Sequence, residues 1–199
     1  KFAKGMVQLQ NIRPFYQAIY SNMPKIESSS CPTMGVTSKE IVYDREFVMK
    51  LPFSEFLFVS LHEVAHVALL HNARRRGRDS LLWNIACDLV VNAGLAKEFG
   101  LSPGDEKTTQ LYKIKMPTNI VFSPKTDVDT DCTEELYEEL ANQAKKNNYF
   151  NFVQNGAGKG QPQSAGGSGG GNGGESGDGE TGSGSNPGNP GKGGQGQGN

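Results

Sequence analysis

The sequence contains few of the features that crosslink a protein or anchor it in a membrane. Its three cysteines, Cys31, Cys87 and Cys132, are widely spaced and form no CxxC pair. Neither a disulfide framework nor a thiolate zinc site is therefore indicated. No apolar run reaches the roughly 18 residues that a membrane helix needs, and no charged-then-apolar leader opens the chain. We therefore expect a cytoplasmic protein that has no membrane-spanning segment.

The chain also lacks an excess of charge of either sign. Its 20 lysines and arginines face 21 aspartates and glutamates, so the net charge is -1. This balance argues against a general attraction to nucleic acid or to an anionic membrane. One local cluster, Arg74, Arg75, Arg76 and Arg78, lies where a helix should end, and the helix dipole favours cations there. The alternative interpretation of the arginines is a contact with phosphate, as in a nucleic-acid processing factor.

Large apolar side chains are absent from the last part of the chain. Residues 155–199 contain no aromatic residue and no aliphatic residue larger than alanine, but they hold most of the 26 glycines. A segment with nothing to bury cannot offset the conformational entropy of ordering. We therefore predict one folded domain at residues 1–153 and a disordered Gly/Ser/Asn-rich linker at residues 154–199. Because the first residue is Lys1, we also expect the chain to be a partial sequence.

The foldable part is predicted to be mainly helical with a small sheet, which makes the fold class α+β. Apolar residues recur at helical spacing in four regions, and two short β-prone runs indicate a hairpin before the second region. Residues 101–132 lack periodicity and are predicted to form a long loop. The expected helices are residues 2–23 with an interruption at Pro14, 54–75, 81–99 and 134–146, and the expected hairpin joins residues 33–36 to 41–43.

All three histidines fall within ten consecutive positions, and two of them frame the pattern His-Glu-Val-Ala-His at residues 62–66. Residues four apart lie on one face of a helix, so His62 and His66 can reach one ion while Glu63 lies beside them. Zinc lowers the pKa of a bound water, and a neighbouring carboxylate completes its activation. We therefore predict a zinc (Zn2+) site with His62 and His66 as ligands and Glu63 as general base.

The alternative to a metal site is an ordinary buried helix with two core histidines and a surface glutamate. The HExxH pattern arises by chance in a chain of this size with a frequency on the order of half a percent. The flanking segments FLFVSL and VALLH are strongly apolar. Three polar groups would then be buried without a partner, which is unfavourable. The metal site explains these residues better.

A catalytic zinc takes three protein ligands and keeps one position open, so a third ligand is needed. His71 is the first candidate. On an unbroken helix, however, it lies about 180° from His62 and about 140° from His66, and no glycine precedes Gly77 to break the helix. We therefore expect His71 to be a helix-end group or a group that contacts a ligand, rather than a ligand itself.

The next predicted helix supplies a carboxylate. Asn84, Asp88 and Asn92 recur every four positions among apolar neighbours, which gives a narrow polar stripe on a buried helix. A buried carboxylate is strongly unfavourable unless it is paired or binds a cation. We predict Asp88 as the third ligand, with Asn84 and Asn92 orienting the site, and the alternative is an ion pair between Asp88 and an arginine. Weaker candidates, better explained as helix caps or solvated faces, are Asp79, Glu98, Glu134 and Glu135.

HEVAHVALLH followed by RRRGRDSLLWNIACDLVVN resembles the bacterial and phage family called the putative metallopeptidase domain. Its most specific part is the pairing of HExxH with WNxAxDxxxN, and RPFY, GVT…IVYDREFV and DCTEELYEEL extend the similarity over roughly residues 10–145. The resemblance implies a zincin-like fold with a metal site formed by His62, His66 and Asp88. It also implies that the glycine-rich linker leads to a von Willebrand factor A-like domain, which this chain lacks.

Two functions of different classes follow. The first is a zinc-dependent metallopeptidase in which Glu63 deprotonates water and passes the proton to the leaving amine of a peptide or protein substrate. An edge strand of the small sheet would align the peptide, and Tyr43, Tyr112 and Asn84 are candidate oxyanion stabilisers. The alternative is a non-catalytic metal-binding module of a larger assembly with the von Willebrand factor A-like domain. Glu63 favours the enzyme, because a purely structural site has no need of it.

Overall fold

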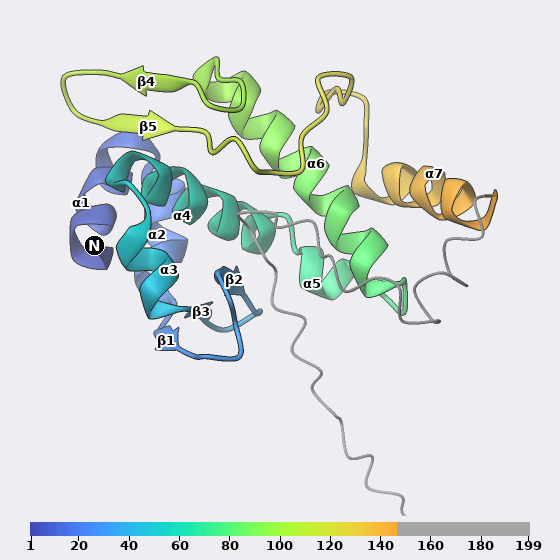
Figure 1. Cartoon of the computed structure of the whole chain (residues 1–199), viewed down its shortest axis with the longest axis horizontal. Helices are drawn as coiled ribbons and strands as arrows, with labels where there is room; N and C mark the ends of the chain where they lie inside the picture. The colour runs from blue at the N-terminus through green and yellow to red at the C-terminus, as the bar shows by residue number, and fades with distance from the viewer. Residues whose placement is uncertain (147–199) are drawn as a thin grey trace, which may run out of the picture.

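The computed structural model in Figure 1 describes residues 1–146 and is mixed α+β, as predicted. The predicted domain boundary after residue 153 and the predicted linker at 154–199 lie outside the described residues. None of the described helices is long and apolar enough to cross a membrane. In chain order the elements are α1 (Phe2–Ile12), α2 (Pro14–Asn22), β1 (Lys25–Glu27), β2 (Met34–Val36), β3 (Ile41–Tyr43), α3 (Arg45–Lys50), α4 (Phe53–Ala68), α5 (His71–Arg74), α6 (Ser80–Phe99), β4 (Glu106–Thr108), β5 (Lys113–Lys115) and α7 (Thr133–Lys146).

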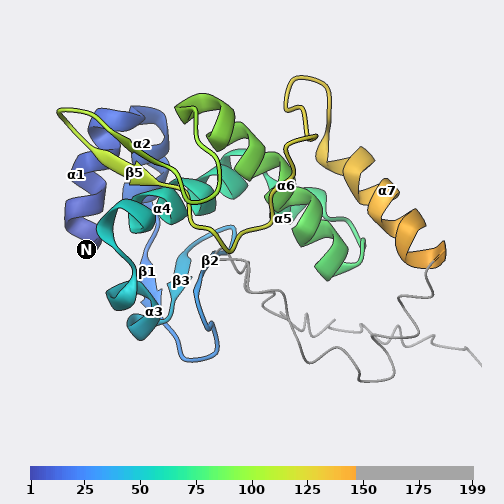
Figure 2. The same ribbon diagram turned by 45° about the horizontal axis from the view of Figure 1, so that its top comes forward.

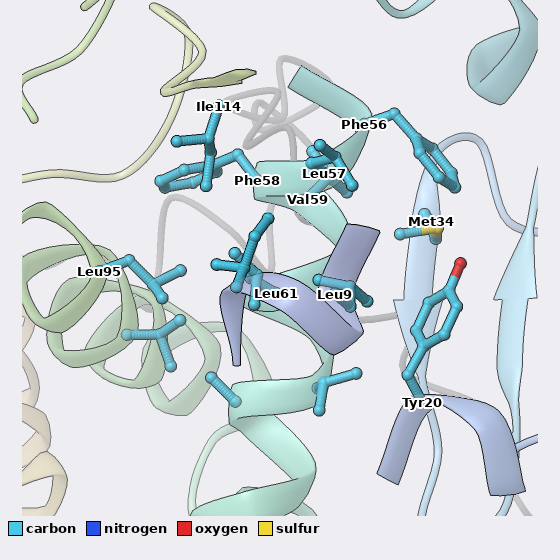
Figure 3. Packing of buried hydrophobic residues seen from close by; sticks show 14 of the residues in the cluster. Leu9, Tyr20, Met34, Phe56, Leu57, Phe58, Val59, Leu61, Leu95 and Ile114 are labelled. Carbon is cyan, nitrogen blue, oxygen red and sulfur yellow. The ribbon is translucent and has the colours of Figure 1, made fainter. Parts of the chain in front are cut away.

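Helix α4 lies at the centre of the fold, in contact with α1, α2, β2, β5 and α6 (Figures 1 and 2). Its apolar side chains are buried on several faces, and Figure 3 shows them between residues from the surrounding helices and strands. Burying each large apolar side chain contributes about 1.5–3 kcal/mol, so this helix anchors the core. The labelled side chains of α4 are Phe56, Leu57, Phe58, Val59 and Leu61, and their labelled neighbours are Leu9, Tyr20, Met34, Leu95 and Ile114.

The predicted hairpin is confirmed as strands β2 and β3, which pair antiparallel with Met34 opposite Tyr43. A third strand, β1, pairs parallel with β3, so the sheet has the order β1-β3-β2. The sequence did not indicate β1, because it has only three residues and is mostly exposed. Strand β2 is buried along its whole length and packs on α4, which places one edge of the sheet against the helix that carries the HExxH segment.

Besides β1, three elements were missed by the sequence-based prediction. Strands β4 and β5 form an antiparallel hairpin within the region predicted as a loop, and their residues EKT and KIK carry no apolar run that would reveal them. Helix α3 was also not predicted. Its start is fixed by Asp44, whose side chain accepts a hydrogen bond from the Phe47 N–H at 2.6 Å.

The interruption predicted at Pro14 is confirmed, because Arg13 is extended and Pro14 begins α2. Helix α6 also agrees with the prediction. The Asp79 side chain accepts from the Leu82 N–H at 2.9 Å to cap its start, and Gly100 ends it in the left-handed conformation. Helix α7 begins at Thr133 and packs alongside α6 (Figure 2).

The prediction of one unbroken helix over residues 54–75 is wrong. Helix α4 ends at Ala68, and Leu70 adopts a left-handed conformation with φ of 55° before α5 begins. Such a conformation costs a non-glycine residue roughly 1–2 kcal/mol, so contacts beyond the break must offset it. The chain turns inward there, because His71 is buried while Leu69 and Leu70 are exposed. The orientation expected for His71 on a continuous helix therefore does not apply.

Candidate metal centre

The two histidines of the HExxH segment lie one turn apart on α4 and face one another. Their ring centroids are 4.5 Å apart, and Nε2 of His62 is 2.9 Å from Nε2 of His66. Both side chains are buried. The four-residue spacing on a regular helix accounts for this arrangement, as the sequence predicted.

Asp88 reaches the same point from α6. Its Oδ1 atom lies 3.5 Å from Nε2 of His62 and 3.2 Å from Nε2 of His66. The alternative, an ion pair between Asp88 and an arginine, is not formed among residues 1–146. Arg74 pairs instead with Glu134, with Nε 3.0 Å from Oε1. The three predicted ligand residues are thus brought together.

The donor atoms fit a small divalent ion. Zinc binds histidine nitrogen and carboxylate oxygen at about 2.0–2.2 Å, so tetrahedral ligand atoms stand about 3.3–3.5 Å from each other. The observed separations among the three atoms run from 2.9 to 3.5 Å. Asp88 Oδ1 is buried and has no hydrogen-bond partner within the described chain. A cation would satisfy this carboxylate, whose charge the His62 and His66 rings otherwise face.

Asn92 orients His62. Its Oδ1 atom lies 2.8 Å from Nδ1 of His62, and its Nδ2–H donates to the carbonyl of Val121 at 2.8 Å. The structure thus places Asn92 where the sequence suggested, beside a candidate ligand. Asn84, the other residue expected to orient the site, is half-buried on α6 and makes no side-chain hydrogen bond to any described residue.

His71 contacts His66, because the break at Leu70 turns its ring back towards α4. Nδ1 of His71 is 3.0 Å from Nδ1 of His66, and its Nε2 is 3.4 Å from the Thr133 hydroxyl. The sequence allowed His71 to contact a ligand, but gave Thr133 no role beyond capping α7. Nothing in the local pattern could reveal this contact, because Thr133 is 62 positions away along the chain.

Cys87 lies near the same rings. The ligand atoms of His66, His71 and Cys87 are all within 4.8 Å of one another, as are those of His62, His66 and Asp88. Sequence reasoning set the cysteines aside because no CxxC spacing is present, and that spacing rule does not detect mixed clusters of histidine and cysteine. Burial raises the pKa of the Cys87 thiol, and the neighbouring Asp88 carboxylate raises it further.

The ionisable side chains of the cluster shift one another's pKa values. Burial opposes protonation of His62, but hydrogen bonding and proximity to Asp88 raise its pKa to about 9. Burial would raise the pKa of Asp88, yet His62 and His66 hold it below its usual range. Burial and the charge on His62 lower the pKa of His66. Burial also lowers the pKa of His71, to about 3, so this ring is neutral at ordinary pH.

Glu63 is completely buried beside the cluster. Neither carboxylate oxygen has a hydrogen-bond partner in the part of the chain that the structure describes. Burial raises the pKa of Glu63 to about 8, with the His62 charge lowering it and the Asp88 charge raising it. An unpaired buried carboxyl group is expensive to maintain, which is a reason to expect a chemical role for it.

The two tyrosines considered as oxyanion stabilisers have aromatic partners elsewhere. The ring of Tyr43 packs against Phe2 with centroids 4.6 Å apart, and the ring of Tyr112 packs against Phe99 at 6.4 Å. Neither contact involves the histidine cluster. The geometry therefore gives no support to either tyrosine as an oxyanion stabiliser.

The arginine cluster supports the ends of short helical segments. Arg74 donates to the carbonyl of Leu69 at 3.0 Å, and Arg78 donates to the carbonyl of Arg74 at 3.0 Å. The guanidinium group of Arg78 also lies 5.0 Å from the centroid of the Trp83 ring. These contacts agree with the interpretation of the arginines as helix-end cations.

Comparison with known proteins agrees with the resemblance seen in the motifs. The profile of a family described as "Putative metallopeptidase domain" matches residues 1–198. No curated protein and no solved structure gives a significant match. The family description, together with the possible metal-binding groups of histidine, aspartate and cysteine, supports a metal-dependent hydrolase at a coarse level. Since the profile covers nearly the whole chain, the chain belongs to the putative metallopeptidase domain family.

Proposed function

We propose that the chain is a zinc metallopeptidase of the HExxH type, with His62, His66 and Asp88 as metal ligands and Glu63 as general base. The observation that carries this proposal is the convergence of three donor atoms, 2.9 to 3.5 Å apart, beside a buried carboxyl group that has no partner among residues 1–146. We extend the proposal to a zincin-like fold, in which the sheet precedes and packs on the active helix.

When bound, a zinc ion supplies a Lewis acid for a substrate carbonyl and lowers the pKa of a water. The protein side chains supply the rest. His62 and His66 offer neutral Nε2 atoms, and Asp88 offers a negative charge that offsets part of the ion's charge. Glu63 accepts a proton from water at one carboxylate oxygen and delivers it to the leaving amine.

Strand β2 is the element suited to hold a peptide substrate. It lies at an edge of the sheet and packs on α4, and because its residues are buried, its backbone groups would pair with an extended chain only after the groups that cover them move. The Asn72 side chain already donates to the carbonyl of Val36 at 3.3 Å. A peptide that pairs with β2 would replace or flank this contact.

Access to the site requires a movement. His62, Glu63, His66 and Asp88 are each at most 4 % exposed, so a peptide cannot reach them in this conformation. The segment between β5 and α7 runs along α6 (Figures 1 and 2). It is attached to the site through the hydrogen bond from Asn92 to Val121. We propose that displacement of this segment admits substrate.

The second candidate function is a non-catalytic metal-binding module that acts with a von Willebrand factor A-like domain attached through residues 154–199. The enclosure of the site favours this function, since a structural ion needs no access for substrate. The unpaired Glu63 carboxyl favours the enzyme, because it is no ligand and burial penalises it.

One pair of measurements separates the two functions. Zinc content by elemental analysis and cleavage of casein or a peptide library are compared between the wild type and Glu63→Gln. The peptidase predicts that the wild type cleaves, whereas the variant retains zinc and cleaves at least about a hundredfold more slowly. Retained zinc in both proteins, with no cleavage by the wild type, would support the binding module.

A further inference from the structure

We propose that His71 is a positioning residue for the metal centre, and that Thr133 at the start of α7 fixes its ring. In this arrangement His71 accepts a hydrogen bond from Nδ1–H of His66 and donates one to the Thr133 hydroxyl. The inference rests on the proposed zinc site. It assigns a role to a histidine that the HExxH pattern leaves unexplained.

The argument begins with the tautomer of His66. A neutral histidine that offers Nε2 to a metal carries its proton on Nδ1, and that N–H needs an acceptor when it is buried. Nδ1 of His71 is 3.0 Å away, and both rings are buried. For this hydrogen bond to form, Nδ1 of His71 must be unprotonated.

The tautomer of His71 follows from that of His66. A neutral imidazole with an unprotonated Nδ1 has its proton on Nε2. Nε2 of His71 lies 3.4 Å from the hydroxyl of Thr133, which is 2 % exposed. The hydroxyl accepts this hydrogen bond. Nδ1 of His66 and both ring nitrogens of His71 then each have a defined role.

The two metal-ligand histidines are supported in the same way. His62 donates Nδ1–H to Oδ1 of Asn92 at 2.8 Å, and His66 donates Nδ1–H to His71. Asn92 belongs to α6, whereas the support of His66 passes through the turn at Leu70 to α7. Each ring is thus oriented from a different part of the fold.

Further contacts fix the position of His71. Its backbone carbonyl accepts a hydrogen bond from the Trp83 indole N–H at 3.0 Å. The Trp83 ring packs edge-on against the rings of both His71 and Tyr137, the latter from α7. The Arg74–Glu134 ion pair joins α5 to the first turn of α7. The placement of α7 therefore influences the orientation of His66.

A second metal site formed by His66, His71 and Cys87 is the competing explanation of the same cluster. It would require each ring to offer an unprotonated nitrogen and would require a thiolate at Cys87. The 3.0 Å contact between the two Nδ1 atoms is already explained by one hydrogen bond. The positioning role needs no change in protonation of the cysteine, and the observed contacts favour it.

The test combines ring tautomers with zinc affinity. Long-range nitrogen–proton NMR spectra of protein labelled with ¹⁵N-histidine report which ring nitrogens carry protons, in both the metal-free and the zinc-loaded full chain. We expect Nδ1–H on His66 and Nε2–H on His71 in the zinc-loaded protein, and the same protonation of His71 without metal. Nδ1–H on His71, or a proton on neither Nδ1 atom, would overturn the proposal.

Matched variants test the affinity. His71→Phe keeps an aromatic ring but removes the acceptor, and we expect zinc affinity, measured by competition with a chelator, to fall about 10- to 100-fold. His71→Asn retains an acceptor near Nδ1 and should recover most of that loss. Equal affinity in wild type and His71→Phe would overturn the proposal, as would equal losses in His71→Phe and His71→Asn.

A second pair of variants leaves both histidines in place. Thr133→Val removes the hydroxyl while keeping the shape, and Thr133→Ser keeps the hydroxyl. Thr133→Val should shift the His71 ring towards a mixture of tautomers and weaken zinc binding more than Thr133→Ser. No difference between the two would count against the role of α7.

Cobalt distinguishes the competing metal site. A thiolate-to-cobalt charge-transfer band that disappears in Cys87→Ser would show a second site and overturn the positioning role. Its absence, with cobalt bound at one equivalent, supports that role. Failure of the wild type to bind any metal would refute the proposed zinc site, whereas the tautomers of the metal-free rings would still report on the hydrogen bond between His66 and His71.

Discussion

The carboxamide of Asn92 lies 2.8 Å from Nδ1 of His62, so a residue of α6 determines which ring nitrogen of a histidine on α4 faces Asp88. The same carboxamide donates to the carbonyl of Val121. One side chain therefore orients a candidate ligand and also holds the segment between β5 and α7. These two roles can be separated by substitution.

Asn92→Leu removes both hydrogen bonds, whereas Asn92→Asp keeps an acceptor for His62 and loses the donor to Val121. We expect zinc affinity to fall about 10- to 100-fold in Asn92→Leu and much less in Asn92→Asp. Hydrogen exchange of the backbone near Val121 should speed up in both variants. Zinc affinity and exchange rates that change together in both proteins would show that the two roles are not separable.

Asp88→Asn removes the negative ligand with little change in volume. We expect the bound zinc, measured by elemental analysis after dialysis against a weak chelator, to fall from about one equivalent to a small fraction. Asp129→Asn is the matched control, because Asp129 forms an exposed ion pair with Lys97 and should leave zinc content unchanged. Equal zinc in wild type and Asp88→Asn would remove Asp88 from the proposed ligand set.

The sequence could predict His62, His66 and Asp88 because their positions depend on local rules. Two histidines four residues apart share a helix face wherever that helix lies. A carboxylate on an otherwise apolar helix needs a buried partner, whatever the details of the fold. These rules hold without knowledge of the tertiary structure. They indicated the same three residues that lie together in the structure.

The sequence allowed His71 to contact a ligand, but its contact with His66 could not be predicted, because that contact depends on one backbone conformation. Leu70 adopts a positive φ that leucine rarely takes, and no glycine or proline marks the break. Thr133 reaches His71 only through the packing of α7 on α6. The β4–β5 hairpin escaped prediction for a related reason, since its exposed residues follow no apolar alternation and pair through tertiary context.

Leu70→Gly tests the strain at this break. Glycine adopts a positive φ without a steric penalty, and the Leu70 side chain is 62 % exposed, so little packing is lost. Relief of the strain should stabilise the folded protein, and the greater freedom of glycine in the unfolded chain should offset part of this gain. We therefore expect the free energy of unfolding to rise by about 0.5–1 kcal/mol. Leu69→Gly is the control, because Leu69 has an ordinary negative φ. It should destabilise the protein, and a similar loss in both variants would show that Leu70 is not strained.

Glu63→Gln should change the pH dependence of stability in the metal-free protein. The pKa of Glu63 is raised from 4.5 to about 8 by burial, so the folded protein keeps this proton after the unfolded chain has released it. The contribution of Glu63 to stability is therefore greatest below pH 4.5 and falls as pH rises towards 8, at up to about 1.4 kcal/mol per pH unit. Glutamine does not titrate. The free energy of unfolding of the variant, relative to that of the wild type, should therefore increase with pH.

The difference in stability between the two proteins is easiest to interpret between about pH 5 and pH 6.5. The pKa of His62 is about 9 in the folded protein, against an ordinary value of 6.5. His62 therefore stays protonated in both the folded and the unfolded state over most of that range. The pKa values of His66 and His71 are lowered in the folded form of both proteins, so their contributions to stability largely cancel in the difference. Urea unfolding with a chelator present gives the free energy of unfolding at each pH. Parallel curves for wild type and Glu63→Gln would mean that the Glu63 carboxyl releases its proton at the usual pH. The protonated, uncharged Glu63 carboxyl group expected for the metal-free protein would then be wrong.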